Sequence, residues 1–440
     1  MSADLAGSEP GKVPGRFLLA MIDGGGTVPP ALGLAAGLVR RGHQVRVLAD
    51  PTVAAAARSA GCAFTSWRTA PHFDSLSEQT ALIAAMEARS PWGQFAAARD
   101  LLICGPADKF ATDVRETTEQ WPVDAILAEA ALPGILIGAE STGLPTAALM
   151  ANIYLRPTPG LPLFGTGWLP ARGALGRARD RLAAAAFRRV WSKSLPGLNA
   201  TRTGYGLPAI GDLYEVFDHC ARVLVMTSPT FDFAAPQLPG NVRYVGPQLD
   251  DPDWAEGEAW RPPGDEPLVL VGMSSIYQNQ TGVLRRVAAA LSELPVRAVI
   301  TTGRAVDPDQ IEAAGNVRMV TSAPHREILP ESAVVVTHAG HGTVLKTLAA
   351  GVPLVCVPMG RDQADNTVRV LRLGAGVRVK KTAGPRQFAA AVRQVLDEPN
   401  YTHAASSFAA TLAREAETRP TAIDEAETLL TLGHSHLRGG

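Results

Sequence analysis

The chain has 440 residues, 46% of them hydrophobic and 19% charged, which favours a folded protein of two domains and excludes extensive disorder. Its formal net charge of -1 gives no electrostatic reason to expect nucleic acid as a partner. The four cysteines form no C-x-x-C pair, and no apolar run is long enough for a signal sequence or a membrane span, so we expect a cytoplasmic protein.

Short apolar segments alternate with helical ones in the first half of the chain, which we predict to be one domain over residues 1–246. Strands are expected over 17–22, 44–48, 124–128 and 145–149, and helices over 30–41 and near 134–141. Continuous apolar strands between helices are typical of parallel sheets that are covered on both faces. This block is therefore predicted to be α/β, with a doubly wound sheet.

The alternation breaks between about 155 and 213. A loop rich in Pro and Gly is followed there by a basic amphipathic helix, expected over 175–193. The stretch is either a surface excursion or an insert that binds a substrate.

Residues 247–265, rich in Asp, Pro and Gly, are predicted to link this domain to a second one over 266–440. In the second block, strands are expected over 267–273, 298–301, 317–320, 333–337 and 354–357. Helices over 283–294 and 368–373 lie between them, and a long helix-forming tail runs from about 402 to about 432. A second doubly wound parallel sheet is the expected result.

The most specific signal lies within residues 334–366. A buried strand ends at His338, a turn with Gly340 and Gly342 follows, and a helix begins near Thr343. Such a turn presents free backbone N–H groups and the positive end of the helix dipole, which suits a diphosphate. His338 or His341 can add a hydrogen bond to such an anion, although a lone histidine at a strand end is usually structural.

The chain returns as a strand after Gly351. This places Asp362 and Gln363 at the carboxyl edge of the same sheet, where open α/β sheets bind ligands. The alternative is that the pair caps the following helix, since Asp is a good N-cap residue.

The order of these residues resembles the nucleotide-sugar signature of the inverting glycosyltransferases of family 1, which include plant, macrolide-type bacterial and UDP-glucuronosyl enzymes. The signature appears here as His338, Gly340, Thr343, then Gly351-Val352-Pro353, then Asp362, Gln363 and Asn366. Ala323-Pro324-His325 resembles the family's base-contacting turn, and Ser274-Ser275 its phosphate-side serine. The resemblance covers most of the chain and is weakest from about 155 to 213.

This resemblance implies a GT-B fold, in which two facing Rossmann-like domains enclose a cleft. The C-terminal domain would bind the nucleotide sugar, the N-terminal domain would bind the acceptor, and the last helix would cross back to the N-terminal domain. The implied donor-binding residues are Ser275, Ala323, His325, His338, Gly340, His341, Gly342, Thr343, Asp362 and Gln363. Asp362 and Gln363 would hold sugar hydroxyls, whereas His341 either contacts the sugar or only begins the helix.

Two positions depart from the family pattern. Lys346 stands where the family commonly has a Glu that holds the ribose, so the base is left open between uracil, thymine and others. Thr27 stands where the family has its catalytic His, and a threonine hydroxyl cannot act as a general base near neutral pH.

Three explanations of Thr27 remain open. Glu129, near the place of the family acid that orients the His, or Asp23 acts as the base while Thr27 positions the acceptor. The acceptor is itself acidic, as a carboxylate or phenol. Or the chain is a poor catalyst or a helper subunit.

We therefore expect an inverting transfer of a sugar from a UDP- or dTDP-sugar to a lipophilic natural product, without a metal, by a monomer or homodimer. The apolar side chains of 161–169 suggest the lipophilic acceptor. Alternatives are a non-catalytic helper, a nucleotide-sugar epimerase, or an enzyme of lipid intermediates at a membrane surface, which only the basic helix over 177–189 favours. Gly24-x-Gly26 also resembles a dinucleotide fingerprint, but Pro29 replaces its third glycine and disfavours an oxidoreductase.

Overall fold

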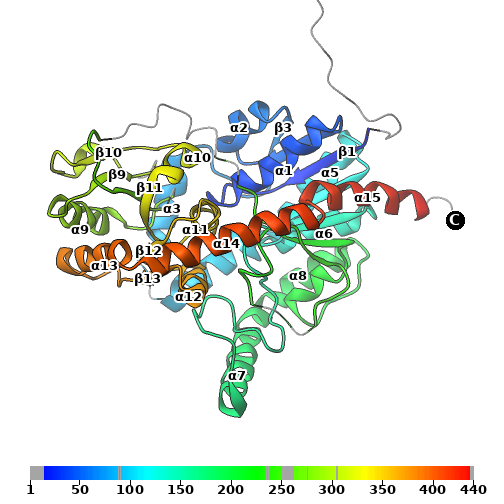
Figure 1. Cartoon of the computed structure of the whole chain (residues 1–440). Helices are drawn as coiled ribbons and strands as arrows, with labels where there is room; N and C mark the ends of the chain where they lie inside the picture. Colours follow the sequence, from blue (N-terminus) through cyan, green and yellow to red (C-terminus); the bar gives the residue numbers. More distant parts are fainter. Residues whose placement is uncertain are drawn as a thin grey trace, which may run out of the picture.

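The structure, a computed structural model, describes residues 14–436 except 88, 90, 234, 236, 250, 252–261, 275, 304 and 305. Within these residues it contains two parallel β-sheets that lie side by side, each with helices around it (Figure 1). Apolar clusters cover both faces of each sheet. The prediction of two doubly wound, Rossmann-like domains is confirmed.

The first sheet has the order β3-β2-β1-β4-β5-β6-β7. Its strands are β1 (Arg16–Ala20), β2 (Gln44–Ala49), β3 (Ala63–Ser66), β4 (Ala125–Glu129), β5 (Thr146–Met150), β6 (Arg222–Val225) and β7 (Val242–Tyr244). The helices of this half of the chain are α1 (Val28–Arg40), α2 (Ala54–Ser59), α3 (Leu76–Glu87), α4 (Pro91–Ala98), α5 (Ala107–Gln120), α6 (Pro133–Ser141), α7 (Gly173–Trp191) and α8 (Leu195–Gly204).

The second sheet has the order β10-β9-β8-β11-β12-β13. Its strands are β8 (Leu268–Gly272), β9 (Arg297–Thr301), β10 (Val317–Val320), β11 (Ser332–Thr337), β12 (Leu354–Cys356) and β13 (Gly376–Arg378). The helices of this half are α9 (Thr281–Ser292), α10 (His325–Ile328), α11 (His341–Ala349), α12 (Gln363–Leu373), α13 (Pro385–Asp397), α14 (Pro399–Thr418) and α15 (Ala422–His436). None of the described helices is long and apolar enough to cross a bilayer.

Strand order reverses between β1 and β4 in the first sheet and between β8 and β11 in the second. In open parallel sheets the crevice at such a reversal, at the carboxyl ends of the strands, is the usual ligand site. Glu129 ends β4, and His338 directly follows β11. Both predicted sites therefore lie at reversal points of their sheets.

The expected strands and helices occur at their predicted places, with ends that shift by a few residues. The sequence did not single out β3, β6, β7 or β13. β7 and β13 have only three residues each, and β3 is partly exposed, so none of these three is a continuous buried apolar run.

The expected helix-forming tail consists of two helices. α14 ends at Thr418 and α15 begins at Ala422, with Pro420 between them. Proline lacks the backbone N–H that a helix needs and clashes with the preceding turn, so the helix breaks there.

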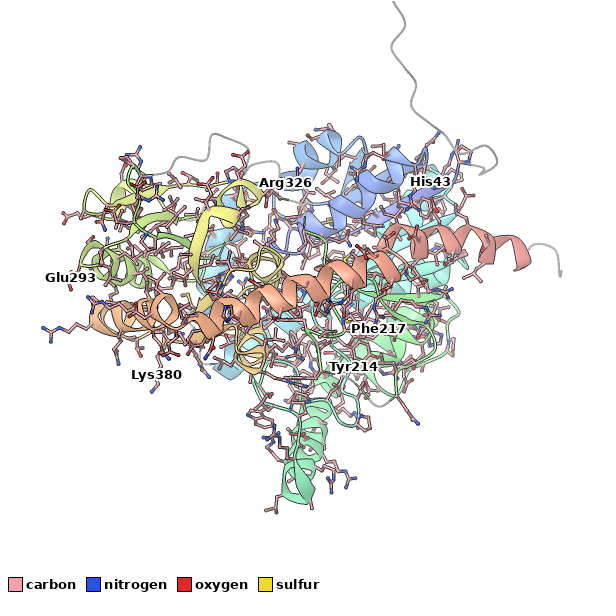
Figure 2. The ribbon with its side chains drawn as sticks, viewed as in Figure 1. His43, Tyr214, Phe217, Glu293, Arg326 and Lys380 are labelled. Carbon is pink, nitrogen blue, oxygen red and sulfur yellow. The ribbon has the colours of Figure 1, made fainter. Side chains whose placement is uncertain are left out.

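This break lets the chain return to the first domain. Figure 1 shows α14 running across the molecule and α15 lying against the first sheet's unit. Ala422, Ala426 and Leu429 of α15 are fully buried in the cluster that covers one face of that sheet. His43, labelled in Figure 2 near this helix, places Nε2 3.0 Å from Glu427 Oε1.

Candidate active site

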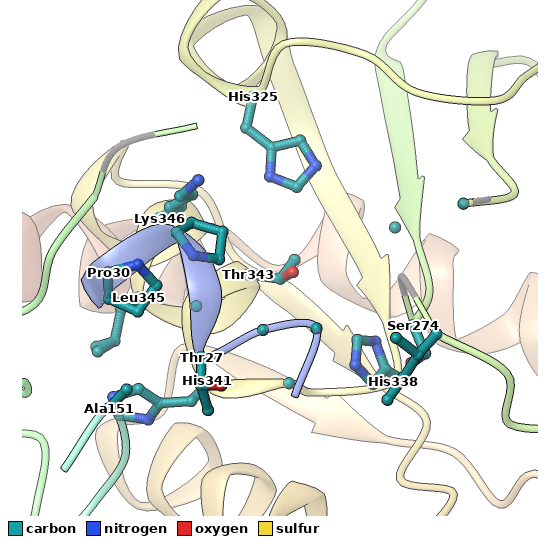
Figure 3. Close-up of a pocket in the computed structure, with 18 of the residues that line it drawn as sticks. Thr27, Pro30, Ala151, Ser274, His325, His338, His341, Thr343, Leu345 and Lys346 are labelled. Carbon is teal, nitrogen blue, oxygen red and sulfur yellow. The ribbon is translucent and has the colours of Figure 1, made fainter. Parts of the chain in front are cut away.

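A cleft with a cavity volume of about 310 Å³ lies between the two domains. The turn from Gly24 to Thr27 lines it from the first domain, and the start of α11 lines it from the second. Figure 3 shows Thr27 on its turn opposite His338, Thr343 and Lys346. The structure brings nearly all the predicted donor residues to this cleft: Ala323, His325, His338, Gly340, His341, Gly342, Thr343, Asp362 and Gln363. Ser275 lies outside the described residues, but Ser274 also lines the cleft.

The turn between β11 and α11 is tightly built around His338. Ala339 has a φ of 68°, in the left-handed region that non-glycine residues rarely adopt. A Cβ added at Gly340 would lie 2.5 Å from His338 Nε2, so only glycine fits there. Burial lowers the pKa of His338 to about 4, which keeps the imidazole neutral at pH 7. A neutral imidazole donates one hydrogen bond, and around it the first N–H groups of α11 are free to bind an anion.

His341, at the start of α11, is also held neutral, because burial lowers its pKa. Its Nδ1 lies 3.4 Å from Asn366 Oδ1, and its ring meets Phe231 edge to face. Its Nε2 is buried and, within the described residues, has no hydrogen-bond partner at normal geometry. The Met226 backbone lies close enough to this imidazole to oppose the lowering of its pKa, so the protein encloses the ring on this side.

Asp362 and Gln363 lie at the predicted edge but differ in their contacts. Asp362 is the N-cap residue of α12, yet its side chain makes no capping bond and instead accepts from Asn366 Nδ2 at 2.7 Å. Gln363 Oε1 accepts from the backbone N–H groups of Met359 and Gly360, and its Nε2 donates to Gln278 Oε1. Gln363 thus holds the loop that precedes α12, in addition to lining the cleft.

Lys346 is paired with a residue that the sequence did not single out. Its Nζ lies 2.7 Å from Asp251 Oδ1, and Asp251 Oδ2 accepts from the backbone N–H of Arg326 at 3.0 Å. Asp251 comes from the predicted linker and lines the cleft together with His325. Burial, and then the Lys346 charge, lower the pKa of His325 to about 4. Lys346 was a sequence signal for such a partner, since charged groups that are mostly buried are usually paired.

Glu129 lies on the opposite side, at the end of β4. Its Oε2 accepts from the backbone N–H of Ile22 at 2.9 Å. Burial raises its pKa to about 7, and the negative charges of Asp50 and Asp23 add to the rise. Thr27 Oγ1 is buried without a partner at normal geometry among the described residues, yet it faces Glu129 closely enough to oppose this rise.

Asp23 is occupied by its own turn. Its Oδ1 accepts from the N–H of Gly25, which has a φ of 69°, and its Oδ2 accepts from Thr52 Oγ1 at 2.7 Å. Asp23 lines neither the cleft nor the adjoining pocket, whereas Thr27 lines both. Its carboxylate therefore shapes the turn that carries Thr27.

An apolar pocket of about 190 Å³ adjoins the cleft on the first domain's side. Among the described residues that line it, Glu129 alone is ionisable. The apolar ones include Leu19, Met21, Ala31, Leu149, Met150, Leu155 and Phe164. Thr27, Ala151, Asn152 and Met226 line both cavities, so they mark the junction. A molecule in the pocket would meet Glu129 and Thr27 on its way to the cleft.

Several known proteins are similar to this chain in sequence or in structure. A family model described as UDP-glucoronosyl and UDP-glucosyl transferase matches residues 208–421. The 4'-demethylrebeccamycin synthase of Lentzea aerocolonigenes is 30% identical over 398 residues, which are 89% of this chain and 94% of that protein.

Two solved structures show that the likeness extends over almost the whole fold. The glycotransferase of kitacinnamycin has a TM-score of 0.72 and 22% identity, over 94% of this chain and 98% of its own. The glycosyltransferase VinC in complex with dTDP has a TM-score of 0.63 and 17% identity, over 96% of this chain and 100% of its own.

Proposed function

The chain belongs to the family of UDP-glucoronosyl and UDP-glucosyl transferases. From this premise we propose which of its residues bind the sugar donor and which bind the acceptor. It is a glycosyltransferase with the GT-B fold, which transfers a sugar from a nucleotide-sugar donor to a small-molecule acceptor. The helper and epimerase alternatives are not favoured by relatives that are themselves named as synthases or glycosyltransferases. The proposal concerns the donor nucleotide, the acceptor pocket and the role of each side chain.

The donor is a UDP- or dTDP-sugar, with its diphosphate at the start of α11. The observation that carries this proposal is the neutral, buried His338 beside the glycine turn and the free N–H groups of α11. His338, Gly342 and Thr343 donate hydrogen bonds to the diphosphate, and the helix dipole favours its charge. VinC, which shares the fold, is solved with dTDP.

The nucleoside end of the donor lies toward His325 and the pair of Lys346 and Asp251, one helical turn beyond the diphosphate. Asp251 Oδ1 accepts from Lys346 Nζ and Oδ2 accepts from the Arg326 N–H. Each carboxylate oxygen can accept a further hydrogen bond, from a sugar hydroxyl or a base N–H in the cleft that Asp251 lines. At the other end, Asp362 and His341 hold the hydroxyls of the transferred sugar.

The acceptor is a lipophilic small molecule in the apolar pocket. Glu129 takes the proton from the acceptor's nucleophilic atom, which Thr27 Oγ1 holds in place. That atom then forms its bond to the anomeric carbon from the side opposite the diphosphate, the bond from this carbon to the diphosphate oxygen breaks, and the configuration inverts. The donors at the start of α11 stabilise the charge on the departing diphosphate, without a metal ion.

A thermal-shift experiment tests the donor site. Melting temperatures of the wild type are measured with UDP, dTDP, GDP and ADP in buffer that contains EDTA. One of UDP and dTDP should raise the melting temperature, since a ligand that binds only the folded state stabilises it by about 2.7 kcal/mol at a hundredfold excess over Kd. His338→Ala should weaken that ligand about 10- to 100-fold, because a hydrogen bond to a charged group is lost.

His403→Ala is the matched control, since His403 is exposed on α14. Its thermal shifts should equal those of the wild type. The assignment of the donor site is wrong if none of the four nucleotides shifts the wild type, or if His338→Ala responds as strongly as the control.

A further inference from the structure

Helix α7 has no buried residue, and Figure 1 shows it projecting from the rest of the molecule. Two of its leucines are unusually exposed: Leu175 is 89% exposed and Leu182 is 72% exposed. Large apolar side chains that share one projecting surface mark a place where something else binds.

The two ends of α7 behave differently. Near its carboxyl end, Phe187 and Trp191 pack against Phe95 of α4, with ring centroids 6.1 and 5.0 Å from the Phe95 ring. This aromatic contact fixes the helix to the first domain. The amino-terminal half extends beyond it, so its surface is open to a partner.

The surface opposite the aromatic contact carries an apolar stripe. Leu175, Ala178, Leu182 and Ala186 are all exposed and follow one another at intervals of three, four and four residues. Residues at these intervals lie on one face of a helix. We call this the α7 stripe.

Positive charge accompanies the stripe. Arg177, Arg181 and Arg189 are exposed, and none of them forms an ion pair with another described residue. Arg179 and Arg188 pair with Asp180 and Asp212, and Asp180 is the only acidic residue of the helix. The whole chain has a net charge of -1, so this helix concentrates positive charge that the composition does not reveal.

From this arrangement we propose that α7 binds an anionic lipid surface, with the α7 stripe at the acyl boundary and its arginines among the headgroups. A helix with an apolar face flanked by long cationic side chains binds at the surface of a bilayer. Its apolar atoms insert at the acyl boundary, and its cationic side chains extend to the headgroups. A second copy of the chain fits less well, since two copies paired along the stripe would bring arginines of like charge together.

The helix is joined to the acceptor pocket by the preceding loop. Leu155 and Phe164 of that loop line the pocket, and the N–H groups of Gly165 and Gly167 donate to Asp365 of α12. Lipid binding at α7 would therefore hold the pocket near a bilayer, where lipophilic molecules concentrate. The role of the pocket in binding a lipophilic acceptor rests on the proposed function, whereas lipid binding by α7 does not.

The test is co-sedimentation of the full-length protein with vesicles. Vesicles of phosphatidylcholine mixed with phosphatidylglycerol should carry down the wild type at low ionic strength, and pure phosphatidylcholine vesicles should carry down much less. Arg181→Glu should lower the partition coefficient at least about fivefold, the effect of one basic residue at an anionic surface. The double variant Leu175→Ser, Leu182→Ser should lower it by at least as much.

Matched controls lie elsewhere on the surface. Leu371→Ser, at a leucine that is 40% exposed, and Arg393→Glu, at an exposed arginine of α13, should partition as the wild type does. Nucleotide-induced thermal shifts of all variants should be unchanged, which shows that they are folded and separates this test from that of the donor site.

Two results would overturn the proposal. One is a wild type that stays in the supernatant with anionic vesicles. The other is binding that the α7 variants do not reduce. If the double leucine variant instead converts a dimer to a monomer in size-exclusion chromatography, without vesicle binding by the wild type, the α7 stripe pairs with a second copy.

Discussion

Replacement of Glu129 by Gln should lower kcat by about 10²- to 10⁴-fold, the usual contribution of a general base. Gln keeps the shape of the side chain and can still accept from the Ile22 N–H, but it cannot take a proton from the acceptor. Steady-state kinetics with an identified donor and acceptor measure the loss. Glu119→Gln, at an exposed glutamate of α5, is the control and should leave kcat unchanged.

The pH dependence distinguishes a base from a merely structural carboxylate. The pKa of Glu129 is raised to about 7, so the wild-type kcat/KM should rise as the pH increases through about 7. Residual activity of Glu129→Gln should lack this rise. If Glu129→Gln keeps both the kcat and the pH profile of the wild type, a group other than Glu129 takes the proton from the acceptor.

The same substitution should stabilise the fold above neutral pH. The pKa of Glu129 is higher in the folded protein than its ordinary value of 4.5, so the folded state holds this proton more tightly. The free energy of unfolding therefore falls as the pH rises from about 4.5 to about 7. Above that range the folded protein contains a buried, ionised carboxylate, which destabilises it. Glu129→Gln should melt at a higher temperature than the wild type at pH 8. A lower melting temperature would mean that lost activity reflects damage to the fold.

Replacement of Asp232 by Ala should lower the free energy of unfolding by about 3–5 kcal/mol, because it leaves a buried guanidinium unpaired. Arg369 Nη2 lies 2.6 Å from Asp232 Oδ1, and both side chains are at most 4% exposed. Asp232 Oδ2 also accepts from the Tyr154 N–H and the Tyr244 hydroxyl, each at 2.9 Å. Urea denaturation followed by circular dichroism measures the change.

Two further variants make this prediction specific. Asp232→Ala combined with Arg369→Leu should recover part of the lost stability, since the unpaired charge is gone as well. Glu119→Ala removes a partner of an exposed pair and should cost less than about 1 kcal/mol. If the double variant is no more stable than Asp232→Ala, the cost does not come from the unpaired guanidinium.

This ion pair bears on function because it joins the two halves of the chain. Asp232 follows β6 of the first sheet, and Arg369 lies on α12 of the second domain. Thr27 and His341 face the cleft from opposite domains, so their separation depends on contacts of this kind. Loss of the pair should therefore affect donor and acceptor alignment as well as stability.

The sequence by itself determined the two doubly wound sheets and the segment at the start of α11. A continuous apolar strand must be covered on both faces, and strands that alternate with helices are covered in this way in parallel α/β sheets. His338, Gly340 and Thr343 are neighbours along the chain, so their placement on one strand, turn and helix follows from local geometry. The break between α14 and α15 is equally local, because Pro420 alone ends the first of these helices.

Only the tertiary structure decided which charges meet. Asp251 and Lys346 are 95 positions apart, and no local pattern pairs them. Glu129 and Ile22 are 107 positions apart, and the pKa of Glu129 depends on burial that the strand alone does not reveal. Asp23 and Thr52 are 29 positions apart, and their hydrogen bond holds the Asp23 carboxylate within its own turn, outside the residues that line the cleft. The physical reason is common to all three: burial and electrostatic interaction depend on distance in space, which sequence spacing fixes only within a single turn, strand or helix.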